Sequence, residues 1–404
     1  MAGKTARPRT LETRTRINGL SLHRRTGRAA RHDEVFAARE VAPLAEHVDQ
    51  TQEFPYEVWS KLGELGIINM NFPEPAGGSG ADMLSQCLAI EEIGYADSSY
   101  TPTFSAQQSS CRHILRYARE PKRSEWIEKY VKPICRGEAW GATALTEPNS
   151  SSNDASSMQT TAVRDGDAWV ISGNKMYSTA SGMKNTLFVI VWAIVDKQTR
   201  ASKMFLVPSG TPGFVVGNKL PKLGLRGADT RELFFDDCRI PLDHILDGEN
   251  SSDINPVGDT QFHSRLFLAS NAIGLQRFCL DEALRFARER KTWGVPLSQR
   301  QLIQGWLAEM ATDIEVSTLL RDRAAWRYDR GEMTVAEAAM VKYVCAENAL
   351  KAANYASDIF GGLGFMEGVP VVRRLRDAKG LTIILGGITL FKWIIAKELG
   401  CTDE

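Results

Sequence analysis

The spacing of apolar residues changes twice along the chain, which divides it into three parts. Between residues 33 and 137, apolar residues recur at helical intervals and predict helices over 38–48, 56–65 and 81–93. A loop rich in proline and glycine, residues 71–80, separates the last two. Residues 33–137 are therefore expected to form an N-terminal helical domain.

The middle part has a different residue pattern, in which short segments rich in β-branched or aromatic residues are separated by turn residues. These segments lie at 169–172, 186–195, 203–208, 213–216 and 232–238. Asp165-Gly166 is a hairpin signal between 160–164 and 169–172. The pattern predicts a small β-domain over residues 138–248.

Long helical patterns return after a linker, 246–260, that is rich in Gly, Asn, Ser and Asp. The first covers 266–290, and the second begins near 302 and carries an apolar stripe. A third begins with a capping box at Thr334 and Glu337 and stops at Gly361. With a fourth helix at 388–399, residues 249–404 predict a bundle. The fold class is therefore α+β and mostly α.

Composition and charge narrow the class of protein. The chain has 404 residues, of which 43% are hydrophobic and 24% charged, and its formal net charge is zero. This balance is typical of a globular protein of two or three domains and argues against disorder and against a general nucleic-acid binder. No run of about 18 apolar residues occurs, so no membrane span is expected.

The first 32 residues hold nine of the 49 basic residues and one acidic residue. A basic, acid-poor extension of this kind is typical of a mitochondrial transit peptide and equally of a basic tail, and both readings stay open. We expect a cytoplasmic protein, or one of the mitochondrial matrix if residues 1–32 are a transit peptide. The seven cysteines are odd in number and widely spaced, and no histidines are paired at ligand spacing. A reducing compartment and no metal site are expected.

General sequence motifs predict no chemistry. No G-x-G-x-x-G follows a predicted strand, and neither a phosphate-binding P-loop nor a nucleophile elbow is present. One feature stands out: the polar loop 146–152 lies at the boundary between helical and β parts, where ligands often bind. The alternative is an ordinary solvated loop.

Six segments, in this order, resemble the acyl-CoA dehydrogenase family, and the resemblance extends over residues 33–400. They are ALTEP at 144–148, GNKMYST at 173–179, KLGLR at 222–226 leading to TRELFFDDCRIP at 230–241, RERKTWG at 288–294, IFGGLGF at 359–365 and RDAK at 376–379. The resemblance implies the same three-part fold, usually as a homotetramer built as a dimer of dimers. It also implies FAD bound between the β-domain and the bundle, with part of the site supplied by a neighbouring subunit.

The resemblance carries cofactor roles onto particular residues of the β-domain. Leu145 and Thr146 match the strand end along the flavin ring, and Thr179 matches the hydroxyl that reaches flavin N5. Tyr177 stands in place of the usual tryptophan on the ring face. Ser152 matches a serine that touches both the cofactor and the thioester. Each has an ordinary alternative; Thr179, for example, is also a suitable strand end.

Further cofactor and substrate roles fall on the C-terminal part. Arg290 and Thr292 match cross-subunit contacts to the FAD diphosphate. The phosphate oxygens are suitable acceptors for the guanidinium group of Arg290. Gln301, Gly361 and Gly362 match further dinucleotide contacts. The two glycines are also explained as a helix stop. Asp358 stands where a glutamine is common, an anion facing the diphosphate. Arg265 matches a CoA-side arginine and Gly386 a substrate contact.

The general base of the family is missing. Removing a proton from the α-carbon of an acyl thioester needs a poorly solvated base within hydrogen-bond reach. The usual glutamate position is Leu385, and the alternative position, on an earlier helix, is Ser264. A register shift does not restore a carboxylate, because 378–397 and 260–280 contain no Asp or Glu.

Other departures cluster near this position. The loop 148–153 replaces a Gly-rich segment, Gly387 replaces a threonine, and Phe262 replaces an aspartate near the CoA-side arginine. His263 is the nearest titratable residue to a base position, and its alternative reading is an ordinary hydrogen-bonded histidine at a helix start. Tyr100, Tyr177 and His113 are further candidates that the sequence does not rank.

These observations predict an FAD-dependent enzyme of acyl-CoA dehydrogenase type that acts on an acyl-CoA or related acyl thioester, with an electron-transfer flavoprotein as a candidate partner. The missing carboxylate leaves alternatives open on the same fold. They are β-elimination by a lyase, reduction of an enoyl thioester, a flavin oxidase, and a catalytically silent subunit of a hetero-oligomer. The retained Arg290, Thr292 and Gln301 speak against the last.

Overall fold

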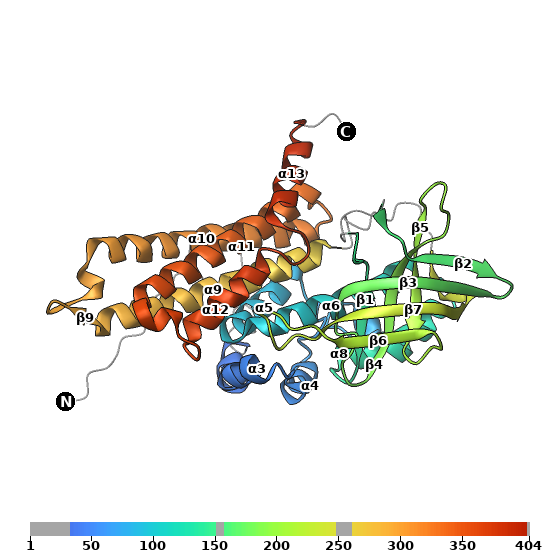
Figure 1. Cartoon of the computed structure of the whole chain (residues 1–404), viewed down its shortest axis with the longest axis horizontal. Helices are drawn as coiled ribbons and strands as arrows, with labels where there is room; N and C mark the ends of the chain where they lie inside the picture. Colours follow the sequence, from blue (N-terminus) through green and yellow to red (C-terminus); the bar gives the residue numbers. More distant parts are fainter. Residues whose placement is uncertain (1–32, 151–156, 248–260, 402–404) are drawn as a thin grey trace.

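The computed structural model describes residues 33–150, 157–247 and 261–401. Within these ranges the chain forms N-terminal helices, a β-sheet and a long helical bundle, so the predicted α+β, mostly α class is confirmed. Figure 1 shows the sheet at one end of an elongated molecule and the bundle reaching to the other, with the N-terminal helices beneath the middle. The residues predicted as a basic extension, 1–32, lie outside the described ranges.

The three helices predicted in the N-terminal part are present, and further helices follow them. The chain is helical without a gap over 38–48, as predicted, but it is not one regular α-helix: a π-helical turn (η1, Ala37–Val41) and a 3-10 turn (η2, Ala42–Leu44) precede α3 (Ala45–Thr51). Pro43 accounts for the change of helix type, because it has no N–H to donate to the preceding turn. The other helices are α4 (Tyr56–Glu64), α5 (Met83–Ala96), α6 (Thr101–Tyr117), α7 (Lys122–Trp126), η5 (Ile127–Val131) and α8 (Lys132–Cys135).

Helix α6 was not predicted because polar residues interrupt its apolar pattern. Gln107 is fully buried, and its side chain donates to the carbonyl of Gly141 (3.1 Å) and accepts from the Gly141 N–H (2.9 Å). This two-way contact fastens α6 to strand β1 (Trp140–Ala144). A polar side chain with both of its hydrogen-bonding groups satisfied is stable inside the protein.

The sheet has the order β6-β7-β3-β2-β4-β5-β8, with β1 paired to β4 in parallel. The predicted hairpin is confirmed, since Asp165 pairs with Ala168 across a two-residue turn. Strand β3 is longer than expected and continues to Thr179. The strands are β2 (Thr161–Asp165), β3 (Ala168–Thr179), β4 (Thr186–Ile194), β5 (Ser202–Pro208), β6 (Phe214–Lys219), β7 (Thr230–Pro241) and β8 (Ile245–Leu246).

The bundle consists of long helices that pack around α9. The Thr334 capping box is confirmed, and the helix it begins ends at Gly361, whose φ is 60°. The elements are α9 (Phe262–Glu289), a short ladder of β9 (Lys291–Thr292) with β10 (Val295–Pro296), α10 (Gln301–Asp329), α11 (Val335–Phe360), α12 (Pro370–Leu381) and α13 (Ile388–Glu398). No described helix has the length and apolarity that a bilayer span requires.

Helices α5 and α9 approach each other closely at two glycines. A Cβ at Gly94 would lie 2.5 Å from Asn271 Oδ1, and one at Gly274 would lie 2.2 Å from the carbonyl oxygen of Glu91. Glu91 is buried at this contact and forms an ion pair with Arg321 of α10 (2.9 Å). The close approach joins the N-terminal helices and the bundle into one core, beside which the candidate site is built.

Candidate functional site

The turn that follows β1 is held against β3 by two hydrogen bonds. The Leu145 carbonyl accepts from Lys175 Nζ (3.1 Å), and the Thr146 carbonyl accepts from the Met176 N–H (2.8 Å). Strand β1 is itself fixed by its pairing with β4. The two bonds to β3 therefore set the direction in which the turn leaves the sheet. Leu145 and Thr146 therefore have a defined position at the edge of the β-domain.

A buried ion pair lies directly beneath this turn. Lys175 Nζ lies 2.7 Å from Glu147 Oε1, and both side chains are almost fully buried. The Glu147 carboxylate also accepts the backbone N–H groups of Gln159 (2.5 Å) and Thr160 (3.0 Å). Burial lowers the pKa of Lys175 to about 8 although Glu147 opposes the shift. Burial alone would raise the pKa of Glu147, but the hydrogen bonds from Lys175, Thr160 and Gln159 and the charge of Lys175 together outweigh burial and lower that pKa.

Tyr177 and Thr179 lie on the end of β3, where the ladder with β7 is irregular. The register shifts between Lys175 and Ser178, and Tyr177 has a φ of 58°. Its side chain is 60% exposed in the single chain. Thr179 pairs with Thr230 at the last position of the ladder. A bulge of this kind redirects a side chain away from the sheet, and here it turns Tyr177 outward.

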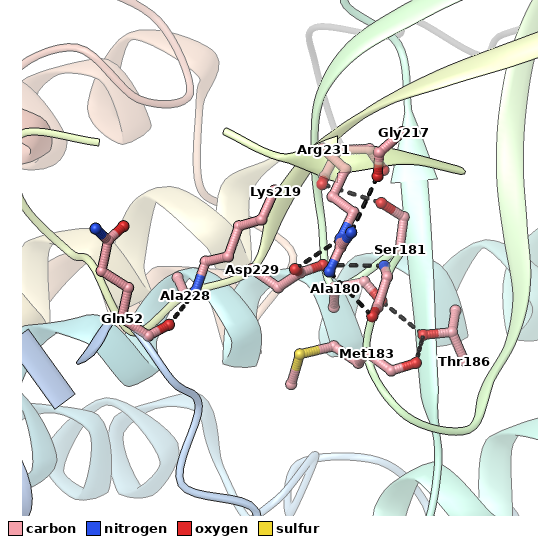
Figure 2. Close-up of polar contacts among 12 residues, drawn as sticks. Gln52, Ala180, Ser181, Met183, Thr186, Gly217, Lys219, Ala228, Asp229 and Arg231 are labelled. Carbon is pink, nitrogen blue, oxygen red and sulfur yellow. Dashed lines mark hydrogen bonds and ion pairs between the residues drawn. The ribbon is translucent and has the colours of Figure 1, made fainter. Parts of the chain in front are cut away.

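The turn after Thr179 is fixed by a network around Asp229 (Figure 2). The Asp229 carboxylate accepts from the Gly182 N–H (2.9 Å) and from Arg231 Nε (2.8 Å), and Arg231 Nη1 donates to the Gly217 carbonyl (3.0 Å). A side chain at Gly182 would collide with Arg231, because its Cβ would lie 1.8 Å from Nε. Lys219 Nζ donates to the Gln52 carbonyl, which connects this network to the chain after α3.

The other predicted cofactor residues lie on the surface at the tip of the bundle that is far from the sheet. Arg290 follows α9, Thr292 is in β9, and Gln301 begins α10. Arg290 and Gln301 are exposed, as is Asp358 near the end of α11. A Cβ added to Gly361 or Gly362 would meet nothing within 4 Å, so the surface beside both glycines is open. Phe286 stacks on Phe360 (4.2 Å) and brings the ends of α9 and α11 together here.

The two groups of predicted cofactor residues do not meet within one chain. Figure 1 places β9 at the far tip of the bundle and β3 in the sheet at the other end of the molecule. The first group, near β1 and β3, is Leu145, Thr146, Tyr177 and Thr179; the second, at the bundle tip, is Arg290, Thr292, Gln301, Asp358, Gly361 and Gly362. Ser152 lies outside the described residues.

The loop between α12 and α13 carries the predicted base position. Leu385 has a φ of 56° and Gly386 a φ of 110°, so a leucine occupies the left-handed region, which costs about 1–2 kcal/mol for a residue with a Cβ. The RDAK motif anchors the preceding helix. Arg376 donates to the Leu223 carbonyl (3.0 Å), and Asp377 accepts the Leu225 N–H (2.6 Å). The loop is therefore built on a firmly held helix.

A buried lysine that the sequence reasoning missed lies behind this loop. Lys342 of α11 is fully buried, and its Nζ donates to the Gly386 carbonyl (3.0 Å) and lies 4.8 Å from the Phe391 ring. The guanidinium of Arg265, also buried, lies 5.2 Å from the same ring. Burial, with a contribution from Arg265, lowers the pKa of Lys342 to about 7, and burial lowers that of Arg265 to about 10. A lysine within the alanine-rich buried face of α11 was the available signal.

Ser264, at the alternative base position, belongs to a polar cluster between α6 and α9. Its Oγ lies 3.3 Å from Ser109 Oγ, which lies 3.1 Å from His263 Nε2. His263 and Ser264 are buried, and Ser109 is half-buried. Ser109 is a second residue that the sequence reasoning missed, because it is 154 positions from His263 and no motif contains it.

The remaining candidates occupy apolar surroundings. His113 stacks on Tyr117, and neither of its ring nitrogens has a hydrogen-bond partner among the described residues. Burial, assisted by Arg112 and Arg116, lowers the pKa of His113 to about 3. Tyr100 is buried against Phe54, and burial raises its pKa well above the ordinary value. Neither residue has the polar contacts that His263 makes.

Comparison with known proteins places this geometry in context. Residues 29–138, 142–238 and 259–400 match the models of the N-terminal, middle and C-terminal domains of acyl-CoA dehydrogenase. The chain is 36% identical to a mitochondrial short-chain specific acyl-CoA dehydrogenase of Homo sapiens, over 90% of this chain and 87% of that protein. It is 32% identical to an acryloyl-CoA reductase (NADH) of Anaerotignum propionicum, over 90% and 91%.

Among solved structures, the fold is similar to that of a glutaryl-CoA dehydrogenase from Mycobacterium smegmatis in complex with FADH2. The TM-score is 0.86, the identity is 27%, and the match covers 95% of this chain and 96% of that one. Together with the domain models, which span most of the sequence, this likeness extends over the helical parts and the sheet alike.

Proposed function

This chain belongs to the acyl-CoA dehydrogenase family, and on that premise we propose that it is an FAD-dependent enzyme acting on an acyl-CoA or a related acyl thioester. The observation that carries the proposal is the arrangement of the two groups of predicted cofactor residues, each surface-accessible and each at a different end of the chain. Such an arrangement suits a dinucleotide that lies between two copies of the chain.

The residues present fit FAD. Arg290 is exposed and makes no ion pair with another described residue, so its guanidinium is available to a diphosphate. Gly361 and Gly362 leave open surface where a phosphate or ribose would approach the backbone. At the other end, Tyr177 is exposed on its bulge and Thr179 ends a fixed strand. FAD, when bound, supplies a hydride acceptor.

The proposal includes a homotetramer, and the exposed apolar residues at the bundle tip support contact with another subunit. Trp293, Phe365 and Leu302, beside the predicted diphosphate contacts, are 92%, 85% and 64% exposed in the single chain. Large apolar side chains clustered at one tip are typical of surface that another subunit covers. We therefore propose a dimer of dimers, in which Arg290 and Thr292 of one chain complete the site on the β-domain of another.

On the thioester side, this chain's residues bind and orient rather than supply a carboxylate. Gly386 presents backbone at the base position, and Arg265 is a buried cation near it. Leu385 keeps a left-handed backbone in a half-buried loop, which supports retention of the loop's shape after loss of the acidic side chain. The thioester is thus positioned as in a dehydrogenase while the proton is handled by other groups.

The experiment is anaerobic mixing of the purified, flavin-containing protein with a panel of saturated acyl-CoAs, with visible absorbance and mass spectrometry of the products as readouts. Bleaching together with an α,β-unsaturated product is expected if the enzyme oxidises its substrate. Bound FAD with neither bleaching nor product for any thioester would contradict the proposal. Product formed with an unchanged flavin spectrum would indicate a lyase, and a colourless protein would favour the silent subunit.

One alternative has specific support. The relative named acryloyl-CoA reductase is 32% identical over most of both chains, so reduction of an enoyl thioester is compatible with this degree of likeness. Starting the same reaction from the enoyl-CoA, with the flavin reduced beforehand, separates the two directions. An electron-transfer flavoprotein remains the candidate partner for the oxidising direction, and reoxidation of bleached enzyme by such a protein is the corresponding test.

A further inference from the structure

A cavity of about 730 Å³ lies where the described chain begins and crosses the bundle. Its walls come from Glu34, η1 and η2, from the C-terminal end of α5, and from α9 and α10. Ligand pockets have volumes of about 300–1,000 Å³, so this cavity is large enough for several side chains. None of the described residues predicted to contact the cofactor or the thioester lines it, so it is separate from the candidate site.

The lining of this cavity combines apolar side chains with an excess of acidic ones. Ala37, Ala96 and Ile314 are its buried apolar residues that lie on three different elements. Carboxylates outnumber guanidinium groups by five to three. The acidic residues are Glu34, Glu92, Asp281, Glu289 and Glu315, and the basic ones are Arg277, Arg285 and Arg288. The lining therefore suits a ligand that has cationic groups on apolar stems.

Two of the three arginines are already shared between carboxylates. Arg277 Nη1 lies 2.7 Å from Glu91 Oε1 and 2.6 Å from Glu92 Oε1. Arg285 lies 3.1 Å from Glu289 and also pairs with an acidic residue outside the lining. These two cations are thus surrounded by at least as much negative charge as they carry. They leave the excess of acidic groups in the cavity uncompensated.

Three acidic side chains at the cavity lack partners within the described ranges. Glu34 and Glu315 line it and make no side-chain hydrogen bond or ion pair there. Asp33, the first described residue, is 6% exposed and also makes none. Burial, together with the charge of Glu92, raises the pKa of Asp33 to about 7. A buried carboxyl group is normally paired or hydrogen-bonded, so a cationic group is missing beside Asp33.

The sequence immediately before Asp33 carries the complementary charge. Residues 1–32 hold nine basic residues and one acidic residue, and residues 13–32 hold six arginines and no acidic residue. Nine residues of extended chain span up to about 30 Å, so residues 24–32 can reach along the cavity from their attachment at Asp33. Because the segment is covalently joined to the cavity wall, its effective concentration there is high.

We propose that this cavity is the docking site of the chain's own basic segment, with arginine side chains of residues 24–31 placed among Asp33 and the acidic residues of the lining. A guanidinium group has five N–H donors, so one arginine can pair with more than one carboxylate. The alkyl stems of the arginines lie along the apolar lining while their charged ends face the acids. A small cationic molecule and a second copy of the chain are the competing occupants, and neither has the advantage of attachment.

The test is trypsin digestion of the full-length, flavin-containing protein, followed by mass spectrometry. An isotope-labelled synthetic peptide of residues 1–32 in the same solution is the internal standard. Cleavage after Arg24, Arg25 and Arg28 is expected to be about tenfold or more slower in the protein than in the peptide, because proteolysis follows the population of undocked segment. Raising NaCl from about 0.1 M to about 1 M shortens the Debye length from about 10 Å to about 3 Å and should reduce this protection.

Charge removal at the cavity separates docking from mere shielding by the nearby fold. Glu34→Gln combined with Glu315→Gln is expected to speed cleavage about 2- to 30-fold, the combined effect of two lost ion pairs at partly exposed positions. Asp33→Asn should speed it as well. The matched control is Glu64→Gln combined with Glu74→Gln, which removes the same charge from exposed positions outside the cavity and should leave cleavage unchanged. Far-UV circular dichroism of every variant verifies that the fold is retained.

The outcomes bear on the cavity and its occupant separately from FAD. Equal cleavage rates in the wild type, the cavity variants and the control would overturn the proposal, as would a wild-type chain cleaved as fast as the free peptide. Protection that falls on dilution would place the segment on a second copy and overturn docking within one chain. Protection that is unchanged on dilution and lost only in the cavity variants supports it. Flavin binding and bleaching do not enter this test, so the proposed function stands or fails independently.

Discussion

Replacing Lys175 by methionine is expected to destabilise the β-domain strongly. Lys175 Nζ lies 2.7 Å from Glu147 Oε1, and the exposed fractions of the two side chains are 0% and 3%. Without the lysine, the Glu147 carboxylate stays buried with the N–H groups of Gln159 and Thr160 as its partners. Removing one partner of a buried pair costs about 3–5 kcal/mol, because the remaining charge is uncompensated.

The measurement is urea unfolding of wild type, Lys175→Met, Glu147→Gln and the double variant, followed by tryptophan fluorescence. The double variant should recover part of the loss, since a neutral glutamine then faces a neutral methionine. Flavin retention should fall with stability, because Lys175 also holds the Leu145 carbonyl. Lys197→Met, at an exposed position, is the control and should change the unfolding free energy by about 0.5 kcal/mol or less. A Lys175→Met loss as small as this control would refute the reasoning.

Three further predictions test other parts of the account. The pKa of Lys342 is lowered to about 7 from 10.5, so its protonated form is unfavourable in the folded protein. The stability advantage of the wild type over Lys342→Met, measured as the difference in unfolding free energy, should therefore rise as pH increases from about 7 to 10.5. A difference that does not change with pH would contradict this. Leu385→Glu should accelerate flavin bleaching by about 10²–10⁴-fold relative to Leu385→Gln, whereas equal rates in two flavin-loaded variants would mean that the loop does not face the α-carbon. Arg290→Ala should weaken FAD binding about 10- to 100-fold in equilibrium dialysis, with Arg288→Ala as the control, and unchanged affinity would remove Arg290 from the cofactor site.

Local patterns were sufficient to predict much of the fold. The capping box at Thr334, the hairpin at Asp165 and the helix stop at Gly361 each depend on a few neighbouring residues, and the structure confirms the cap, the turn and the stop. The prediction failed where tertiary contacts or a single residue changed the local preference. Pro43 interrupts the regular α-helical hydrogen bonding of the first helix, and Gln107 of α6 is buried because Gly141 satisfies its polar groups.

The candidate site, like the fold, was only partly predictable from the sequence. The cofactor positions could be matched because they lie in contiguous motifs, and the absence of a carboxylate near Leu385 could be read directly. The contacts of Ser109 with His263 and of Lys342 with Gly386 could not, since they join residues 154 and 44 positions apart. They depend on how α6 packs against α9 and how α11 packs against the loop between α12 and α13, which the periodicity of apolar residues does not specify.

The most direct test of the central claim is a crystal structure of the flavin-containing protein with a non-reactive acyl-CoA analogue. The account predicts FAD between the Thr179 end of one chain's sheet and Arg290 of the partner subunit, with Ser264 and Leu385 facing the α-carbon and no carboxylate within hydrogen-bond reach of it. An Asp or Glu side chain at the α-carbon, or a cofactor bound within one chain, would contradict the account.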